Sequence, residues 1–420
     1  MRCQPNRVRP LVYTWDMALN LPNIYVDLHQ HPELSFAEHR TAGIVATALL
    51  GLGYEVHTGL GRTGVVGVLE NGDGPTVLLR ADMDALPVLE QTGLTYASVA
   101  RGIDEQGNDV PVMHACGHDV HVTALLGAAE HLAEITDEWA GTLIVLFQPA
   151  EEGGGGAQAM IDDGLFDLVP SPDVVLGQHV APLPSGTIAL HPGVTMAAAD
   201  SIDITLHGVG GHGSRPETTV DPVLMAANLT VRLQQIVSRE VGPSEQAVVT
   251  VGQIHGGTKN NIIPAKAVLG LTVRTFNTDV RSRVIGAIER IANAEAEAAG
   301  AVRAPEFSYN ESFPLTINET VASARVSEAL AAEFGGEAVI DAGVVSGSED
   351  VGVLADAVGA PLVYWFLGGA DRSLFVGADF TQGFPSDLPS NHSPMFAPVI
   401  EPTLSSGVRA LVAAAREWLG

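Results

Sequence analysis

Three short segments of the chain concentrate side chains that bind divalent metal ions. They are 114–121 (HACGHDVH), 148–152 (QPAEE) and 391–394 (NHSP). Together they supply a thiol, several imidazoles and an adjacent pair of carboxylates, which are the usual protein ligands of zinc and related ions. The set predicts a paired-metal site with one carboxylate to spare. Such a site is suited to hydrolysing an amide with water.

The adjacency of Glu151 and Glu152 has a chemical reading. One glutamate can bind metal while its neighbour takes a proton from the attacking water, whose pKa a metal lowers toward ~7. The same free carboxylate can then return the proton to the leaving amine. Neighbouring glutamates are most often solvated surface charges, but these two follow the apolar run TLIVLFQPA. Their position favours a role at the end of a buried strand.

The segments around these residues alternate between helical and strand patterns. The alternation predicts an α/β domain with a mostly parallel central sheet and helices on both faces. Apolar spacing predicts helices over 37–52, 120–135, 319–334 and 401–419, and strands over 63–69, 76–80, 142–147, 173–176 and 362–367.

The expected ligands fall where an α/β sheet binds its ligands, beyond the carboxyl ends of its strands. Glu151 and Glu152 follow the strand predicted over 142–147, and His179 follows the one predicted over 173–176. Cys116 precedes a predicted helix. We expect the dipole of that helix to lower the pKa of the thiol and favour the thiolate that binds metal.

The pattern changes near residue 195. Strands over 201–207, 247–254, 267–276 and 306–310 and helices over 221–240 and 280–299 follow one another in the order β-α-β-β-α-β, which is ferredoxin-like. We therefore predict an inserted ferredoxin-like α+β domain over 195–313. The catalytic domain is then discontinuous, over 17–194 and 314–420, after a loose lead-in over 1–16.

Composition limits the partners and the compartment. The chain has 420 residues, is 46% hydrophobic and carries a formal net charge of −28. It is long enough for two cores, and its acidity argues against nucleic acid and anionic membranes as partners. No apolar run approaches the about 20 residues of a membrane helix. Two cysteines, Cys3 and Cys116, form no disulfide framework, so we expect a cytoplasmic protein.

The motifs resemble those of the dimetal amidohydrolases that include aminoacylases, hippurate hydrolases and indole-acetyl-amino-acid hydrolases. Carboxypeptidase G and succinyl-diaminopimelate desuccinylase are relatives of this group. The resemblance runs from about residue 27 to the C-terminus. It is carried by DLHQHPELSFAE, LLRADMDALPV, HACGHDVH, QPAEEGGGGA, GVGGHGSRPE, NNIIP, SGSED and NHSP. It implies a zinc-peptidase-like catalytic domain and hydrolysis of N-acyl amino acids, or alternatively of dipeptides or acyl-diaminopimelate.

The resemblance also assigns roles to residues. Glu151 should be the general base, Asp84 should orient metal ligands, and His212 should stabilise the oxyanion, often across a dimer into the partner's site. Asn261 and Arg274 are candidates for gripping the substrate carboxylate. The implied ligands of the two divalent ions (zinc, manganese or cobalt) are Cys116, His118, Glu152, His179 and His392. A homodimer is implied as well, with a lid that moves about hinges near 195 and 313.

Each of these residues also has a less specific interpretation. Cys116 alone could be an ordinary buried residue, His179 a core histidine, and Arg274 an ion-pair partner. Asp84 could cap a turn, and His212 and His392 could be surface residues. A cysteine hydrolase or a non-catalytic metal-binding protein are alternative functions, whereas neither a G-x-S-x-G elbow nor a phosphate loop occurs in the sequence. Departures from the family pattern at Val351 and Met395 leave the shape of the acyl pocket open.

Overall fold

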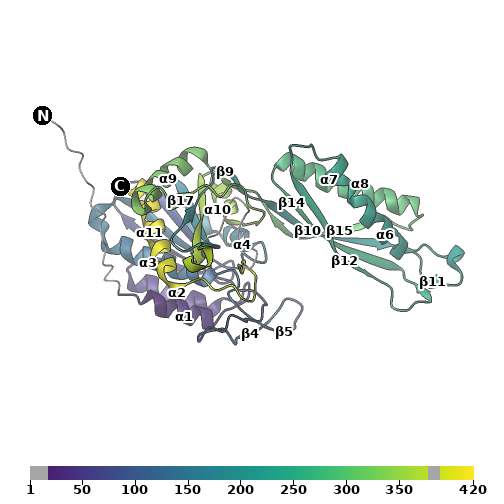
Figure 1. The fold of residues 1–420 in the computed structure, drawn as a ribbon, viewed down its shortest axis with the longest axis horizontal. Coiled ribbons are helices and arrows are strands. Elements are labelled where there is room, and N and C mark those ends of the chain that lie inside the picture. Colours follow the sequence, from purple (N-terminus) through teal and green to yellow (C-terminus); the bar gives the residue numbers. More distant parts are fainter. Residues whose placement is uncertain (1–17, 377–387) are drawn as a thin grey trace.

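Two lobes of unequal size make up the molecule (Figure 1). The computed structural model describes residues 18–376 and 388–420. The larger lobe contains the C-terminal helix and an eight-stranded sheet, and the smaller one contains a four-stranded sheet with its own helices. Within these described residues no helix is both long and apolar enough to cross a membrane.

The large sheet is mostly parallel at its centre. Its order is β1-β2-β6-β3-β7-β18-β8-β17, and β6, β3, β7 and β18 run parallel to one another. The strands of this sheet are β1 (Glu55–Leu60), β2 (Gly64–Asn71), β3 (Thr76–Asp82), β6 (Gly141–Gln148), β7 (Val174–Pro184), β8 (Ile188–Ala189), β17 (Val339–Ile340) and β18 (Leu362–Ala370).

Helices cover both faces of this sheet. Alternation along β3 shows why: Val77 and Leu79 enter one apolar core, whereas Leu78 enters the other. The larger core packs under α1 (Leu21–Gln30), α2 (His39–Gly51), α3 (His118–Glu134), α9 (Thr320–Phe334) and α11 (Ile400–Leu419), and the smaller under α4 (Gly156–Asp162), α5 (Leu165–Leu168) and α10 (Val351–Val358).

The sheet departs from the predicted one in two ways. The strand expected over 173–176 continues to Pro184, so His179 lies within β7 and not after it. The apolar run ends early because a strand can carry polar residues that face a cavity. In addition, β2 pairs antiparallel with both β1 and β6, which puts an antiparallel margin on the parallel centre.

The smaller lobe is wholly antiparallel and ferredoxin-like in strand order. Its sheet runs β12-β14-β10-β15, with helices packed on one face over an independent apolar core. Its elements are β10 (Ala198–His207), α6 (Pro222–Leu233), α7 (Gln235–Arg239), β12 (Ala247–Gly256), β14 (Lys266–Thr275), α8 (Thr278–Ala298) and β15 (Glu306–Phe313). The helix predicted over 221–240 is divided into α6 and α7, and Asp221 caps α6 by accepting from Val223 N.

Two adjacent chain segments connect the lobes. β9 (Gly193–Met196) leads into β10, and β15 leads back into β16 (Thr316–Asn318). β9 pairs with β16, just as β10 pairs with β15. At the opposite end of the smaller lobe, a two-stranded ribbon of β11 (Gly211–His212) and β13 (Ile262–Ile263) lies far from the large sheet (Figure 1). This ribbon and its flanking loops, 209–219 and 257–265, are called the lobe tip below.

Candidate metal centre

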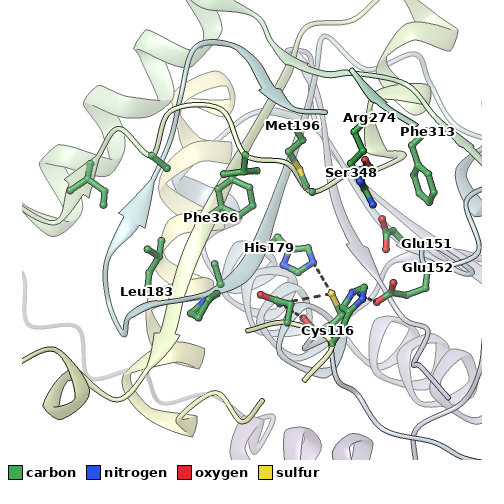
Figure 2. Close-up of a pocket in the computed structure, with 18 of the residues that line it drawn as sticks. Cys116, Glu151, Glu152, His179, Leu183, Met196, Arg274, Phe313, Ser348 and Phe366 are labelled. Atoms are coloured by element: carbon green, nitrogen blue, oxygen red, sulfur yellow. Dashed lines mark hydrogen bonds and ion pairs between the residues drawn. The ribbon is translucent and has the colours of Figure 1, made fainter. Parts of the chain in front are cut away.

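The carboxyl ends of β3, β6 and β7 bring the predicted metal ligands together. Glu151 and Glu152 follow β6, His179 projects from β7, and His118 opens α3. The loop that carries His392 approaches from the other side, where its backbone N donates to Ala115 O at 2.8 Å. Figure 2 shows Cys116, Glu152 and His179 facing one another at the base of a cavity. The ligand cluster below means Cys116, His118, Glu152, His179 and His392.

The donor atoms of the ligand cluster are close enough to share metal ions. Cys116 Sγ lies 3.4 Å from His179 Nε2, and His392 Nε2 lies 3.2 Å from Glu152 Oε1. His118 Nε2 is 4.0 Å from Glu152 Oε1. Two overlapping triads form, each with all donors within 4.8 Å: Cys116 with His118 and His179, and Cys116 with Glu152 and His392. Cys116 belongs to both, as a thiolate shared by two ions would.

Hydrogen bonds fix the two buried imidazoles in orientations suited to metal binding. His179 Nδ1 donates to Val180 O at 2.8 Å, and His118 Nδ1 lies 3.2 Å from Asp84 Oδ1. Because Nδ1 of each ring points at an oxygen acceptor, Nε2 is the ring atom that a neutral imidazole would offer to a metal. Both Nε2 atoms face the ligand cluster.

Asp84 organises more of the site than a turn cap would. Its two oxygens accept from the backbone N of Glu151 and of Glu152, each at 3.1 Å, and from Ser35 Oγ at 2.7 Å. It also receives His118 Nδ1. One fully buried carboxylate therefore positions both the glutamate pair and a histidine of the ligand cluster.

The donor set fits divalent cations. His118 Nε2 is buried and has no hydrogen-bond partner among the described residues, which is costly unless something pairs with it. Although burial lowers the pKa of His118, the surrounding carboxylates, Asp82 first, raise it to about 10. Crowded carboxylates thus demand positive charge here. Bound metal ions would supply that charge.

The expected lowering of the thiol pKa is wrong for the protein without metal. Burial, followed by the nearby charges of Glu152 and Glu151, raises the pKa of the Cys116 thiol well above its usual range. The N-terminus of α3 carries only a partial charge, which does not offset burial beside two carboxylates. Ionisation of Cys116 therefore depends on a cation.

Glu151 occupies a buried, strongly acidic environment. Its side chain lies 3.9 Å from His118 Nε2 and within 4.8 Å of Glu349 and Asp350 donor atoms. Burial, then the charges of Glu349 and Glu152, raise the pKa of Glu151 well above its usual range. A carboxylate with this environment has a high proton affinity, which suits proton transfer.

A buried charge network beneath the site was not anticipated. Arg80, fully buried, donates to Asp82 at 2.6 Å and to Glu349 at 2.8 Å. Asp82 also receives His121 Nδ1, while His121 Nε2 accepts from Val180 N at 2.7 Å. The motifs around residues 80–84 and 346–350 contain these charges, but only the fold shows that they are buried together.

The predicted residues of the smaller lobe divide into two groups. Arg274 lines the cavity of the ligand cluster, and its Nη1 donates to Ser348 Oγ at 2.5 Å. His212 and Asn261 instead lie on the exposed lobe tip, away from the ligand cluster of their own chain (Figure 1). Asn261 O accepts from Gly213 N at 2.8 Å, and His212 Nδ1 accepts from Ser214 N at 3.1 Å.

A cavity of about 660 Å³ opens above the ligand cluster. Arg274 and Ser348 line it on the side of Glu151, and Leu183 and Phe366 lie on the other side, beyond His179 (Figure 2); Glu311 and Met196 line it as well. The positions that depart from the family pattern do not line this cavity: Val351 is buried in the core, and Met395 is exposed outside it.

Comparison with known proteins agrees with this geometry. The sequence model of peptidase family M20/M25/M40 matches residues 78–378 of this chain. A thermostable carboxypeptidase of Saccharolobus solfataricus is 38% identical over 346 residues, 81% of this chain and 84% of that protein. Hippurate hydrolase of Campylobacter jejuni is 42% identical over 324 residues, 76% of this chain and 80% of that protein.

A solved structure is similar over nearly the whole chain. The dinuclear metal-binding peptidase of the M20 family from Bacillus subtilis has a TM-score of 0.73 and is 30% identical, with 94% of this chain and 96% of that one covered. The ligand groups described above suit two divalent ions in the same way. The chain belongs to peptidase family M20/M25/M40 and is a metal-dependent hydrolase that acts on amide bonds.

Proposed function

We propose that this enzyme hydrolyses the amide bond of N-acyl amino acids with water. The observation that carries the proposal is the convergence of five metal-binding side chains beside a spare buried carboxylate, Glu151, at the base of one cavity. Similarity to a hippurate hydrolase over 76% of the chain supports an N-acyl amino acid as substrate.

The ligand cluster would hold two divalent ions, zinc, manganese or cobalt. Its thiolate and imidazoles suit zinc, and its carboxylate also accepts the other two ions. Bound there, the ions would supply an acidified water and polarisation of the substrate carbonyl. Through the hydrogen bonds already described, Asp84 would hold His118 and both glutamates in position toward the ions.

Glu151 would act as general base and then as general acid. It takes the proton of the attacking water and delivers that proton to the leaving amine. Its location supports both steps, because its carboxylate lies next to His118 of the ligand cluster and also lines the cavity.

Arg274 and Asn261 would bind the substrate carboxylate. Arg274 is supported by its position in the cavity, where a half-buried guanidinium can form paired hydrogen bonds to a carboxylate. Such binding would require it to leave Ser348, its present partner. Asn261, on the lobe tip beside His212, could contribute only to a site that the tip reaches.

His212 would stabilise the oxyanion of the tetrahedral intermediate from a second subunit of a homodimer. Its exposure on a tip remote from its own ligand cluster supports this arrangement. We accordingly propose that 195–313 forms an inserted lid and dimerisation domain, with hinges near 195 and 313, and that 17–194 and 314–420 form the catalytic domain. The free thiol of Cys116 supports action in a reducing cytoplasm.

A carboxypeptidase or dipeptidase activity is the second candidate, favoured by the similarity to a carboxypeptidase. An acyl-diaminopimelate deacylase would use the same site. The test is a panel of benzoyl-, acetyl- and indole-acetyl-amino acids and a dipeptide, assayed after chelator stripping and re-addition of zinc, manganese or cobalt. Metal-restored release of amino acid from acyl substrates is expected. Release from the dipeptide alone would favour the second candidate.

A further inference from the structure

The cavity above the ligand cluster has two chemically different ends. At one end Arg274 and Ser348 supply charged and polar groups, with the ring of Phe313 beside them (Figure 2). The other end is almost wholly apolar, and its walls come from β7, β18, β9 and the loop after β17. These apolar side chains are Ala181, Pro182, Leu183, Met196, Ile340, Ala342, Val345 and Phe366.

The chemistry of amide hydrolysis orients the substrate across these two ends. Glu151 must reach the leaving nitrogen to protonate it, so the amino-acid part lies on the side of Glu151. Figure 2 shows Arg274 and Ser348 on that side, which suits a carboxylate. The acyl group must then extend the opposite way, past His179 and toward Phe366 and Leu183. This step rests on the function proposed above.

The apolar end begins directly beside the ligand cluster. Along β7, His179, Ala181 and Leu183 share one face of the strand, because alternate residues point the same way. Phe366 of β18 is the register partner of His179. Leu183 lies roughly 13 Å along the strand from His179, at about 3.3 Å per residue. A continuous apolar wall therefore leads away from the scissile carbonyl.

This end is open at its far side and carries little charge. Ile340, the last residue of β17, and Ala342, on the loop that follows, are both exposed. Among the described side chains of the apolar end, Asp341 is the one charged group, and its Oδ1 already lies 2.7 Å from His191 Nδ1. The α-amine of a dipeptide would lie on the carbon next to the scissile carbonyl, close to the ligand cluster, whereas a simple acyl group extends only carbon along these walls.

We propose that the apolar end is an open-ended acyl channel, and that the preferred substrates carry a medium-length alkyl or arylalkyl acyl group. Acetyl leaves most of the channel unfilled, whereas each added methylene that becomes buried improves binding about fourfold. The selectivity for longer acyl groups resides in Leu183, Val345 and Phe366, not in the metal centre.

The experiment measures kcat/KM of the metal-loaded enzyme for N-acetyl-, N-butanoyl-, N-hexanoyl- and N-octanoyl-glycine and for an unacylated dipeptide. An increase of about fourfold per methylene through the octanoyl member is expected. Leu183→Trp, which fills the far end, should lower the octanoyl-to-acetyl ratio on the order of tenfold or more. Leu50→Trp, the same substitution at an exposed helix position, should leave the ratio unchanged.

Val345→Trp narrows the channel at a second lining position and replaces Leu183→Trp if that variant does not fold. A flat series, a preference for acetyl, or an unchanged ratio in a folded channel variant would overturn the acyl channel while leaving N-acyl hydrolysis intact. Faster cleavage of the dipeptide would also overturn it. Hydrolysis of none of these substrates, with two metal equivalents bound, would instead reject the proposed function and the channel with it.

Discussion

The ligand cluster and the lobe tip hold their functional side chains in opposite ways. In the ligand cluster, Asp84 and the backbone of β7 orient the buried imidazoles. On the lobe tip, His212 is exposed, and its Nδ1 hydrogen-bonds to the backbone N and the Oγ of Ser214 in its own loop. The ligand cluster is organised within one chain, whereas the lobe tip holds His212 away from the ligand cluster of its own chain. If His212 acts as proposed, the complete site includes a surface of a second protomer.

Glu151→Gln should have the largest effect and should act on the first region alone. The amide keeps the size of the side chain but cannot accept and return a proton, so kcat should fall by about 10²- to 10⁴-fold. Metal content, measured by elemental analysis, should stay at the wild-type level. Glu70→Gln, at an exposed position of the same sheet, is the matched control. Turnover within tenfold of wild type would reject Glu151 as the base.

His212→Ala tests the second region. Loss of an oxyanion donor should lower kcat by about 10²- to 10³-fold without changing metal content. His39→Ala, an exposed histidine of the larger lobe, should have no effect.

Mixing the His212→Ala and Glu151→Gln chains then distinguishes the source of His212. If His212 comes from the partner, each mixed dimer contains one intact site, and co-expression should restore activity well above either variant. Activity that remains at the level of the two single variants would place His212 in its own chain's site and undo the comparison.

Asp84→Asn should weaken the organisation of the ligand cluster without removing a ligand. An amide can still accept hydrogen bonds, but it loses the charge that orients His118 and both glutamates. Metal affinity, measured by competition with a chelating dye, should fall about 10- to 100-fold. Asp73→Asn, on an exposed turn, is the control. Unchanged affinity would show that the backbone alone positions the ligands.

His29, a buried histidine outside the ligand cluster, should make a smaller, pH-dependent contribution to stability. Burial lowers the pKa of His29, but hydrogen bonds to Asp119 and Glu90 raise it to about 10. Because the folded pKa exceeds the unfolded value of about 6.5, this stabilisation is complete below pH 6.5 and is lost as pH rises toward 10. The loss is at most about 1.4 kcal/mol per pH unit.

Urea unfolding between pH 7 and 9 measures this term. His29→Gln should be less stable at pH 7, and its free energy of unfolding should fall less steeply with pH than that of the wild type. Comparing the two slopes removes the other titrating groups, which the proteins share. Equal slopes would mean that His29 is neutral in the folded state.

Much of the fold followed from local pattern. The apolar runs before Glu151 and at 362–367 are strands, and Asp221 caps a helix, because burial and capping depend on residues near one another in sequence. The order of elements over 198–313 likewise indicated a ferredoxin-like sheet. The extension of β7 through His179 could not be predicted from the sequence. A polar residue in a buried strand is stable only beside a cavity or site, and other segments of the chain build that site.

The sequence by itself determined the chemistry: a thiol, imidazoles and paired glutamates at fixed spacings, which have few uses other than binding metal and moving a proton. The tertiary structure decided which charges share one buried space. Arg80 and Asp82 lie far from Glu349 along the chain, yet the three meet beneath the site, and burial reverses the shift expected for the Cys116 thiol. Those effects depend on distance and dielectric environment, which no linear spacing contains.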